Sequence, residues 1–216
     1  MRSNHVSSWG YTGISRMRWS LLLSILLVTG CTHLIFQPLK PHVNDPAELG
    51  ITVEEHFFTT RDGVKLHGWR LPAKGESRGT ILFLHGNAEN ISTHIGSVWW
   101  MPQHGYHVYL FDYRGYGRSE GSPTLDGLML DLEAAMRWAV TSAEAKEKGI
   151  VVFGQSLGAS ISVSGLARMK DRDAVQGIVL EGAVSSFRQL ARELLGSSWL
   201  TWPFQWPLAF SIDDRY

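Results

Sequence analysis

Cysteine is almost absent from this sequence. Its 216 residues include one cysteine, Cys31, so the chain cannot form a disulfide bond within itself. No group of cysteine and histidine residues has the spacing that a zinc site requires. The sequence therefore predicts a fold with no internal disulfide and no metal site.

An excess of charge of one sign is also lacking. The chain carries 20 basic and 20 acidic side chains, so its formal net charge is zero. Because no overall field attracts a polyanion, the composition argues against nucleic-acid binding. Hydrophobic residues make up 44% of the chain, and this content and length suit one globular domain with a sizeable core.

Long hydrophobic runs are scarce, and the main one lies near the N-terminus. Arg16 and Arg18 precede a short apolar run from Ser20 to Thr29. A basic flank followed by a short apolar core is typical of an export signal, which we predict over residues 1–31. The end of this segment, Val28-Thr29-Gly30-Cys31, resembles the bacterial lipobox, in which a peptidase cuts before a cysteine that becomes lipid-modified.

Lipidation at Cys31 would attach the protein to a membrane of the cell envelope, outside the cytoplasm. One alternative is a transmembrane anchor reaching Phe36, although that span contains His33 and is barely long enough to cross a bilayer. The other alternative is that the resemblance to an export signal with a lipobox arose by chance. Residues 32–50 contain three prolines and are predicted to be a tether, and residues 51–216 are predicted to form the folded domain.

The domain begins with a predicted β-hairpin and continues as an α/β fold. Strands are expected at 51–60 and 64–71, because Asp62-Gly63 between such runs is a strong hairpin signal. Buried apolar runs follow at helix-sized intervals, at 81–84, 108–111, 150–153 and 178–180. Strands alternating with helices predict a mostly parallel sheet behind an antiparallel N-terminal hairpin.

The clearest predicted helix follows Ser122-Pro123. Serine is a favoured helix cap, and proline is favoured at the first helical position. Apolar side chains then recur at helical spacing, which predicts one face packed on the sheet. They are Leu125, Leu128, Met129, Leu132, Met136, Ala139 and Val140.

A Gly-x-Ser-x-Gly pentapeptide, Gly154 to Gly158, lies between a predicted strand and a predicted helix. The pentapeptide alone is a weak signal, but the apolar run before it predicts a strand buried on both faces. Glycine at 154 and 158 removes Cβ atoms that would clash in a sharp turn. Such a turn lifts the Ser156 hydroxyl out of the sheet, and the N–H of Leu157 at the helix start can face a developing oxyanion.

Two further segments complete a recognisable constellation. His85 to Asn90 follows the strand at 81–84, and a glycine-rich segment from Asp112 to Pro123 follows the strand at 108–111. With these motifs in this order, the chain from about Thr60 to about Ser186 resembles the α/β-hydrolase superfamily, specifically its serine-aminopeptidase-like branch.

The resemblance implies a serine hydrolase that cleaves an ester, thioester or amide through an acyl-enzyme on Ser156, without a cofactor. The substrate would be an acyl compound, either a small molecule or a peptide. The resemblance also implies that Asn87 supplies the second oxyanion N–H, opposite that of Leu157. His85, Asp112 and Arg114 are interpreted as residues that order the surrounding turns.

The sequence departs from the family pattern after Ser156. The triad order is Ser, Asp or Glu, then His, yet no histidine follows His107. The triad acid and histidine are therefore unknown, and we expect the domain to lack its last strands and helices, leaving the strand at 178–180 as an exposed edge. Glu181 is either a displaced triad acid or a carboxylate that orders the site. The alternatives to an enzyme are an inactive remnant and an envelope ligand-binding module.

Overall fold

The computed structural model describes residues 36–170 and 172–183. The predicted signal segment with Cys31, residues 32–35 of the predicted tether and the chain from residue 184 onward lie outside the described residues. In the part that is described, no helix has the length and apolar character needed to cross a membrane.

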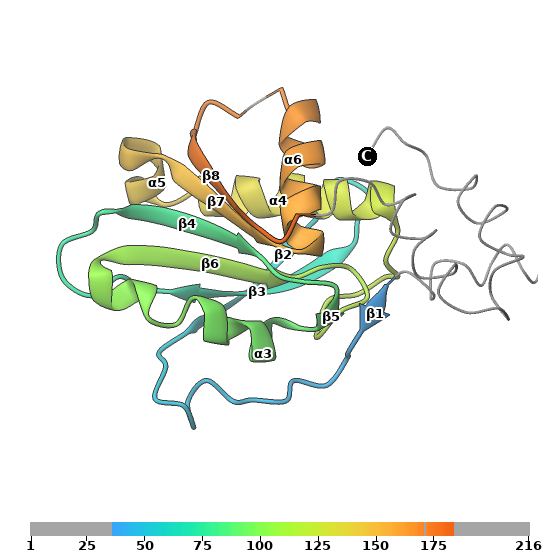
Figure 1. Cartoon of the computed structure of the whole chain (residues 1–216), viewed down its shortest axis with the longest axis horizontal. Coiled ribbons are helices and arrows are strands. Elements are labelled where there is room, and N and C mark those ends of the chain that lie inside the picture. Colours follow the sequence, from blue (N-terminus) through green and yellow to red (C-terminus); the bar gives the residue numbers. More distant parts are fainter. Residues whose placement is uncertain (1–35, 171, 184–216) are drawn as a thin grey trace, which may run out of the picture. The chain divides into compact units, whose positions relative to one another are not determined.

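A six-stranded sheet with the order β2-β3-β6-β4-β7-β8 forms the centre of the domain (Figure 1). Its strands are β2 (Glu54–Thr59), β3 (Lys65–Leu71), β4 (Gly79–Leu84), β6 (Tyr106–Asp112), β7 (Ile150–Gln155) and β8 (Val175–Glu181). β2 and β3 form the predicted antiparallel hairpin, and β3 is also antiparallel to β6. The pairs β4–β6, β4–β7 and β7–β8 are parallel. The predicted mostly parallel α/β sheet is confirmed.

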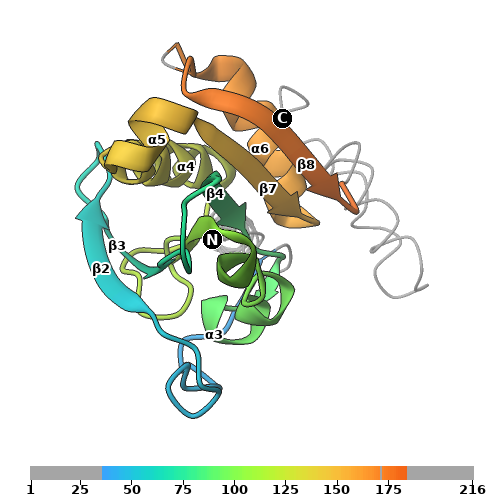
Figure 2. The same cartoon turned by 90° about the vertical axis from the view of Figure 1, so that its left-hand side faces the viewer.

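Helices cover both faces of this sheet (Figures 1 and 2). One face carries α4 (Leu125–Ala139), α5 (Ala143–Lys148) and α6 (Leu157–Arg168). The other carries α3 (Ile91–His94) and two short 3₁₀ turns, Ile95–Ser97 and Met101–His104. The crossover connections follow from the parallel pairs, because a parallel strand can be reached only by returning across a face of the sheet.

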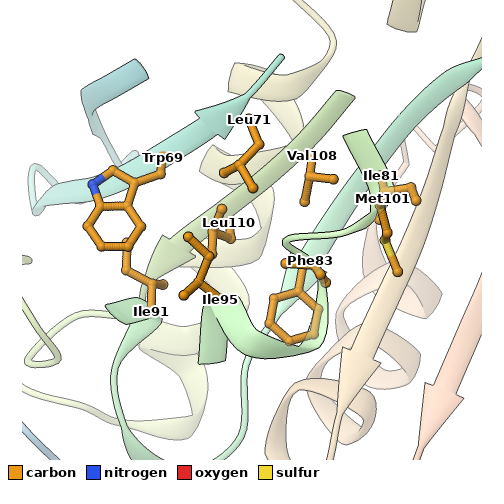
Figure 3. Close-up of a cluster of buried hydrophobic side chains, with 10 residues drawn as sticks. Trp69, Leu71, Ile81, Phe83, Ile91, Ile95, Met101, Val108 and Leu110 are labelled. Atoms are coloured by element: carbon orange, nitrogen blue, oxygen red, sulfur yellow. The ribbon is translucent and has the colours of Figure 1, made fainter. Parts of the chain in front are cut away.

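The core between the sheet and α3 is apolar and closely packed (Figure 3). Strand residues that point to this face alternate along each strand with residues that point to the α4 and α6 face. The buried cluster contains Trp69, Leu71, Ile81, Phe83, Ile91, Ile95, Val98, Met101, Val108 and Leu110. Because β4 is buried along its whole length and β6 from His107 onward, the loops that follow these strands start from rigid positions.

Helix α4 begins two residues later than predicted. Its N-cap is Thr124, whose hydroxyl accepts a hydrogen bond from the Gly127 amide at 3.1 Å. Pro123 is buried, and a Cβ added to Gly115 would lie 2.6 Å from its Cδ. Pro123 therefore packs against the glycine-rich turn instead of opening the helix, so the predicted cap at Ser122 is wrong.

The burial of β7 also differs from the prediction. Ile150 and Val152 are buried, but Val151 and Phe153 are only half-buried, because they lie at the margin of the core on the α3 side. In the described part of the chain β8 forms the sheet edge, as predicted, and Ile178, Val179 and Leu180 are 43–50% exposed.

Residues 36–50 are folded against the domain. β1 (Gln37–Pro38) pairs in parallel with β5 (Ala88–Glu89), and the Val43 amide donates to the Ser92 hydroxyl at 2.8 Å. The Asn90 side-chain amide donates to the carbonyls of residues 39 and 41 at 3.0 and 2.7 Å. The prediction of a tether is therefore wrong for residues 36–50, because side chains distant in sequence satisfy the backbone of this segment.

Candidate active site

Ser156 lies at a sharp strand-to-helix turn. β7 ends at Gln155, α6 begins at Leu157, and Ser156 between them has φ 52° and ψ −109°. Among the described non-glycine residues, only Ser156 and Glu89 have a positive φ. This conformation is unfavourable for a residue with a Cβ atom and typically costs about 1–3 kcal/mol, so the surrounding structure must impose it.

The two glycines of the pentapeptide allow this turn to form. A Cβ added to Gly154 would lie 2.5 Å from the Gly158 carbonyl oxygen. A Cβ added to Gly158 would lie 2.1 Å from the Leu84 carbonyl oxygen and 2.8 Å from that of His85. The start of α6 therefore packs directly on the carboxyl end of β4, which brings Leu157 and the loop after β4 to the same edge of the sheet.

The loop after β4 is held from several directions. Asn87 is half-buried, and its side-chain oxygen accepts hydrogen bonds from the Tyr116 hydroxyl at 2.9 Å and the Gln37 amide at 3.4 Å. On either side of Asn87, the Gly86 and Ala88 carbonyls contact His85 Nδ1 at 2.7 Å and His94 Nε2 at 3.0 Å. These contacts orient the peptide groups around Asn87.

His94 and Gln155 connect this loop with the turn that carries Ser156. His94 Nδ1 lies 3.0 Å from Gln155 Oε1, and Gln155 Nε2 donates to Glu181 Oε2 at 3.3 Å. A Cβ added to Gly86 would lie 3.2 Å from His94 Cε1 and 3.9 Å from Ser156 Cβ. No motif spacing in the sequence pointed to His94 or Gln155, because their relation depends on two loops that meet only in the fold.

Glu181 also contacts the turn through its backbone. Its carbonyl oxygen accepts a hydrogen bond from the Ser156 amide at 2.7 Å, while its side chain is exposed and bonded to Gln155. The end of β8 thus supports the conformation of Ser156. This arrangement agrees with the interpretation of Glu181 as a carboxylate that orders the site.

His85 is fully buried, and its ring is neutral at physiological pH. Burial lowers the pKa of His85 to about 4. Nδ1 faces the Gly86 carbonyl and therefore carries the proton, and Nε2 has no hydrogen-bond partner among the described residues. The ring also stacks on His94, with 5.3 Å between centroids. These contacts match a residue that shapes the loop.

The buried His85 predicts a pH-dependent stability. Its folded-state pKa of about 4 lies below the ordinary value of 6.5, so the unfolded chain binds the proton more readily. The contribution of His85 to stability should therefore be lost as pH falls from about 6.5 towards 4, by about 2 kcal/mol at pH 5 relative to pH 7.5. Urea unfolding at both pH values measures the difference. A His85→Gln variant should lose this part of the pH dependence. His104→Gln, a substitution at an exposed site, should retain it. Equal pH dependence in the wild type and both variants would show that His85 is not the group responsible.

The glycine-rich turn after β6 is ordered by the ion pairs of Arg114. The Arg114 guanidinium donates to both carboxylate oxygens of Asp62, at 2.8 and 3.0 Å, and to Asp131 at 2.9 Å. These hydrogen bonds from Arg114 lower the pKa of Asp62 to about 2. Asp112 is fully buried and accepts a hydrogen bond from the Ile91 amide at 2.9 Å. Both Arg114 and Asp112 thus occupy structural positions, as interpreted from the sequence.

A mostly parallel sheet with a serine at a strained strand-to-helix turn defines an α/β hydrolase. The model of the family described as serine aminopeptidase, S33, matches residues 75–211. The chain therefore belongs to the serine aminopeptidase S33 family of the α/β-hydrolase superfamily.

Known proteins resemble the chain over most of its length. The uncharacterized protein YfhR of Salmonella typhi is 35% identical over 183 residues, which cover 79% of this chain and 58% of that protein. The α/β-hydrolase domain-containing protein WAV2 of Arabidopsis thaliana is 34% identical, with 79% of this chain and 57% of that protein covered. The chain thus spans somewhat more than half the length of these relatives.

A solved structure supports the same fold. The Pyrococcus furiosus esterase Pf2001 superposes with a TM-score of 0.62 at 27% sequence identity. The match covers 83% of this chain and 69% of the esterase chain. The predicted α/β-hydrolase fold is therefore confirmed.

Proposed function

We propose that this protein is a serine hydrolase that cleaves an ester, thioester or amide through an acyl-enzyme on Ser156. The observation that carries the proposal is the position of Ser156, at positive φ between strand β7 and the N-terminus of α6. In this position the hydroxyl stands above the carboxyl edge of the sheet, where α/β proteins bind their ligands. The similarity to an archaeal esterase favours an ester as the substrate.

The oxyanion of the tetrahedral intermediate would be bound by the N–H groups of Leu157 and Asn87. Leu157 is the first residue of α6, where amide groups have no acceptor within the helix. Asn87 lies in the loop that His85 and His94 hold. Each donor of this kind typically contributes about 3 kcal/mol to transition-state stabilisation.

Neither His85 nor His94 is placed to deprotonate Ser156. His94 lies beside Gly86. Its Nδ1 contacts the side-chain oxygen of Gln155 and its Nε2 contacts the Ala88 carbonyl, so both ring nitrogens are engaged. His85 is enclosed and contacts the Gly86 carbonyl. We therefore assign neither of these two histidines to the triad.

A fluorophosphonate probe tests the proposal, because it labels serines at activated positions. We expect labelling of the purified protein at Ser156 and loss of labelling in Ser156→Ala. Ser164→Ala is the matched control, since Ser164 lies on the same helix, two turns beyond the site. Mass spectrometry of the labelled peptide identifies the residue. Equal labelling of wild type and Ser156→Ala would exclude Ser156 as the nucleophile.

A binding module without chemistry is the second candidate, favoured because the ring nitrogens of His94 are engaged by Gln155 and Ala88 and His85 is enclosed. In that case an acyl compound would bind, but neither labelling nor hydrolysis would follow. An inactive remnant would show no binding, no labelling and no hydrolysis. The same purified protein therefore separates these candidates.

We further propose that Cys31 is lipid-modified and attaches the protein to a membrane of the cell envelope. The support is the sequence pattern alone, a basic flank and short apolar run that end in a lipobox-like segment. Metabolic labelling with an alkyne fatty acid should label the wild type and not Cys31→Ser. Labelling of both proteins would exclude Cys31 as the site.

A further inference from the structure

Three side chains distant in sequence meet beside β6, away from the pentapeptide. Nε2 of His42, Nδ1 of His67 and a carboxylate oxygen of Asp112 all lie within 4.8 Å of one another. We propose that these residues bind one divalent transition-metal cation of the Zn²⁺ class. Two imidazoles and one carboxylate are a donor set that suits this class of metal. The inference does not rest on the proposed hydrolysis.

The two contacts to Asp112 have the length expected between ligands of one metal ion. Asp112 Oδ2 lies 3.2 Å from His42 Nε2 and 3.3 Å from His67 Nδ1. Charge-assisted hydrogen bonds are usually about 2.7–2.9 Å long. Ligand atoms around a tetrahedral metal with bonds of about 2.0–2.1 Å are separated by about 3.3 Å, which matches both contacts.

The outer contacts of the cluster are those of a metal centre. His67 Nε2, the nitrogen that points away from Asp112, contacts Glu55 Oε1 at 2.9 Å. Metal-binding histidines almost always donate their second ring N–H to such a carboxylate, which orients the ring. The second oxygen of Asp112 accepts from the Ile91 amide at 2.9 Å, so Oδ2 is the oxygen that faces the two histidines.

The backbone encloses Asp112 closely on one side, and the cluster is partly exposed at His42. A Cβ added to Gly117, which has φ +46°, would lie 1.9 Å from Asp112 Oδ2, so only glycine fits where the backbone passes this oxygen. The Arg118 amide is the remaining, longer contact to Oδ2, at 3.4 Å. The side chains of His67 and Asp112 are fully buried, whereas that of His42 is 18% exposed. The metal therefore enters from the His42 side, where water completes its coordination.

A metal at this position would link three separate parts of the domain. His42 belongs to the N-terminal segment 36–50, His67 to β3 and Asp112 to the end of β6. The metal would hold that N-terminal segment on the sheet. We therefore expect bound metal to raise the melting temperature of the domain.

Zn²⁺ titration of the untagged, chelator-treated full chain tests the proposal. Calorimetry should give one bound Zn²⁺ per chain, and Zn²⁺ should raise the melting temperature. His42→Gln should weaken binding at least about tenfold, because it removes one of three protein ligands. His104→Gln is the matched control, an exposed histidine outside the cluster that should leave binding unchanged.

Glu55→Gln provides a second, independent variant. If circular dichroism shows that His42→Gln is unfolded, the test of the metal site rests on Glu55→Gln. Its expected effect is a loss of about 10–100-fold in Zn²⁺ affinity, with the stoichiometry retained. Absence of Zn²⁺ binding by the wild type would overturn the proposal. Equal Zn²⁺ affinity in the wild type and the folded variants would also overturn the proposal. The cluster would then be a hydrogen-bonded network without metal.

Discussion

Replacing Arg114 with leucine is expected to lower the free energy of unfolding by about 3–5 kcal/mol. The side chain of Asp131 is fully buried and accepts hydrogen bonds from the backbone and the guanidinium of Arg114, both at 2.9 Å. Burial raises the pKa of Asp131 to about 7 even with Arg114 beside it, so at pH 8 the substitution removes the guanidinium and leaves a buried carboxylate without its cation. Losing one partner of a buried pair costs far more than losing the whole pair, because burying an unpaired charge is unfavourable.

Urea unfolding followed by tryptophan fluorescence measures the effect of Arg114→Leu. The control is Arg137→Leu on α4, whose side chain is 49% exposed and pairs with Glu133, so its loss should cost less than about 1 kcal/mol. The double variant Arg114→Leu/Asp131→Leu should recover much of the stability, because neither charge remains buried. Equal effects of the two single arginine substitutions would contradict the role assigned to Arg114.

Replacing Gly158 with alanine is expected to destabilise the fold by about 3 kcal/mol or more. The added Cβ would lie 2.1 Å from the Leu84 carbonyl oxygen and 2.5 Å from its carbon, which belong to the backbone of a fully buried strand. No side-chain rotation relieves this contact. α6 must therefore move away from β4, and Ser156 and Leu157 would shift from the loop that carries Asn87.

The control for Gly158→Ala is Gly96→Ala. A Cβ added to Gly96 has no atom within 4 Å and its φ is not positive, so the change should alter stability by less than about 1 kcal/mol. Fluorophosphonate labelling of the same two variants gives a second measurement. We expect labelling to fall sharply in Gly158→Ala and to be retained in Gly96→Ala. A Gly158→Ala protein as stable as Gly96→Ala would show that α6 does not pack on β4 as described.

Local sequence patterns were sufficient for most of the sheet and for the turn at Ser156. The hairpin across Asp62-Gly63 forms where turn chemistry placed it, because glycine accepts the required positive φ, +86° at Gly63. The pentapeptide places its serine between β7 and α6 because only glycine fits at 154 and 158. At Gly63 and Gly154 the physical reason acts over a few neighbouring residues, whereas Gly158 must also fit against the backbone of Leu84.

Local patterns failed where a distant contact changes the outcome. Ser122-Pro123 has the signal of a helix start, yet Pro123 packs on Gly115 and the helix begins after Thr124. Residues 36–50 have the prolines of a linker, yet Ser92 and Asn90 provide hydrogen-bond partners for that backbone. The contact with Gly115 cannot be inferred from the sequence around Pro123, and the hydrogen bonds from Ser92 and Asn90 cannot be inferred from residues 36–50.

The sequence by itself determined the fold class, the family resemblance and the candidate nucleophile Ser156, because each depends on residue types at short, fixed spacing. Only the tertiary structure revealed that His94 and Gln155 connect the loop after β4 with the Ser156 turn. It likewise brought together His42, His67 and Asp112, separated by 25 and 45 residues in the chain. Contacts across such separations depend on strand order and loop packing, which no local spacing encodes.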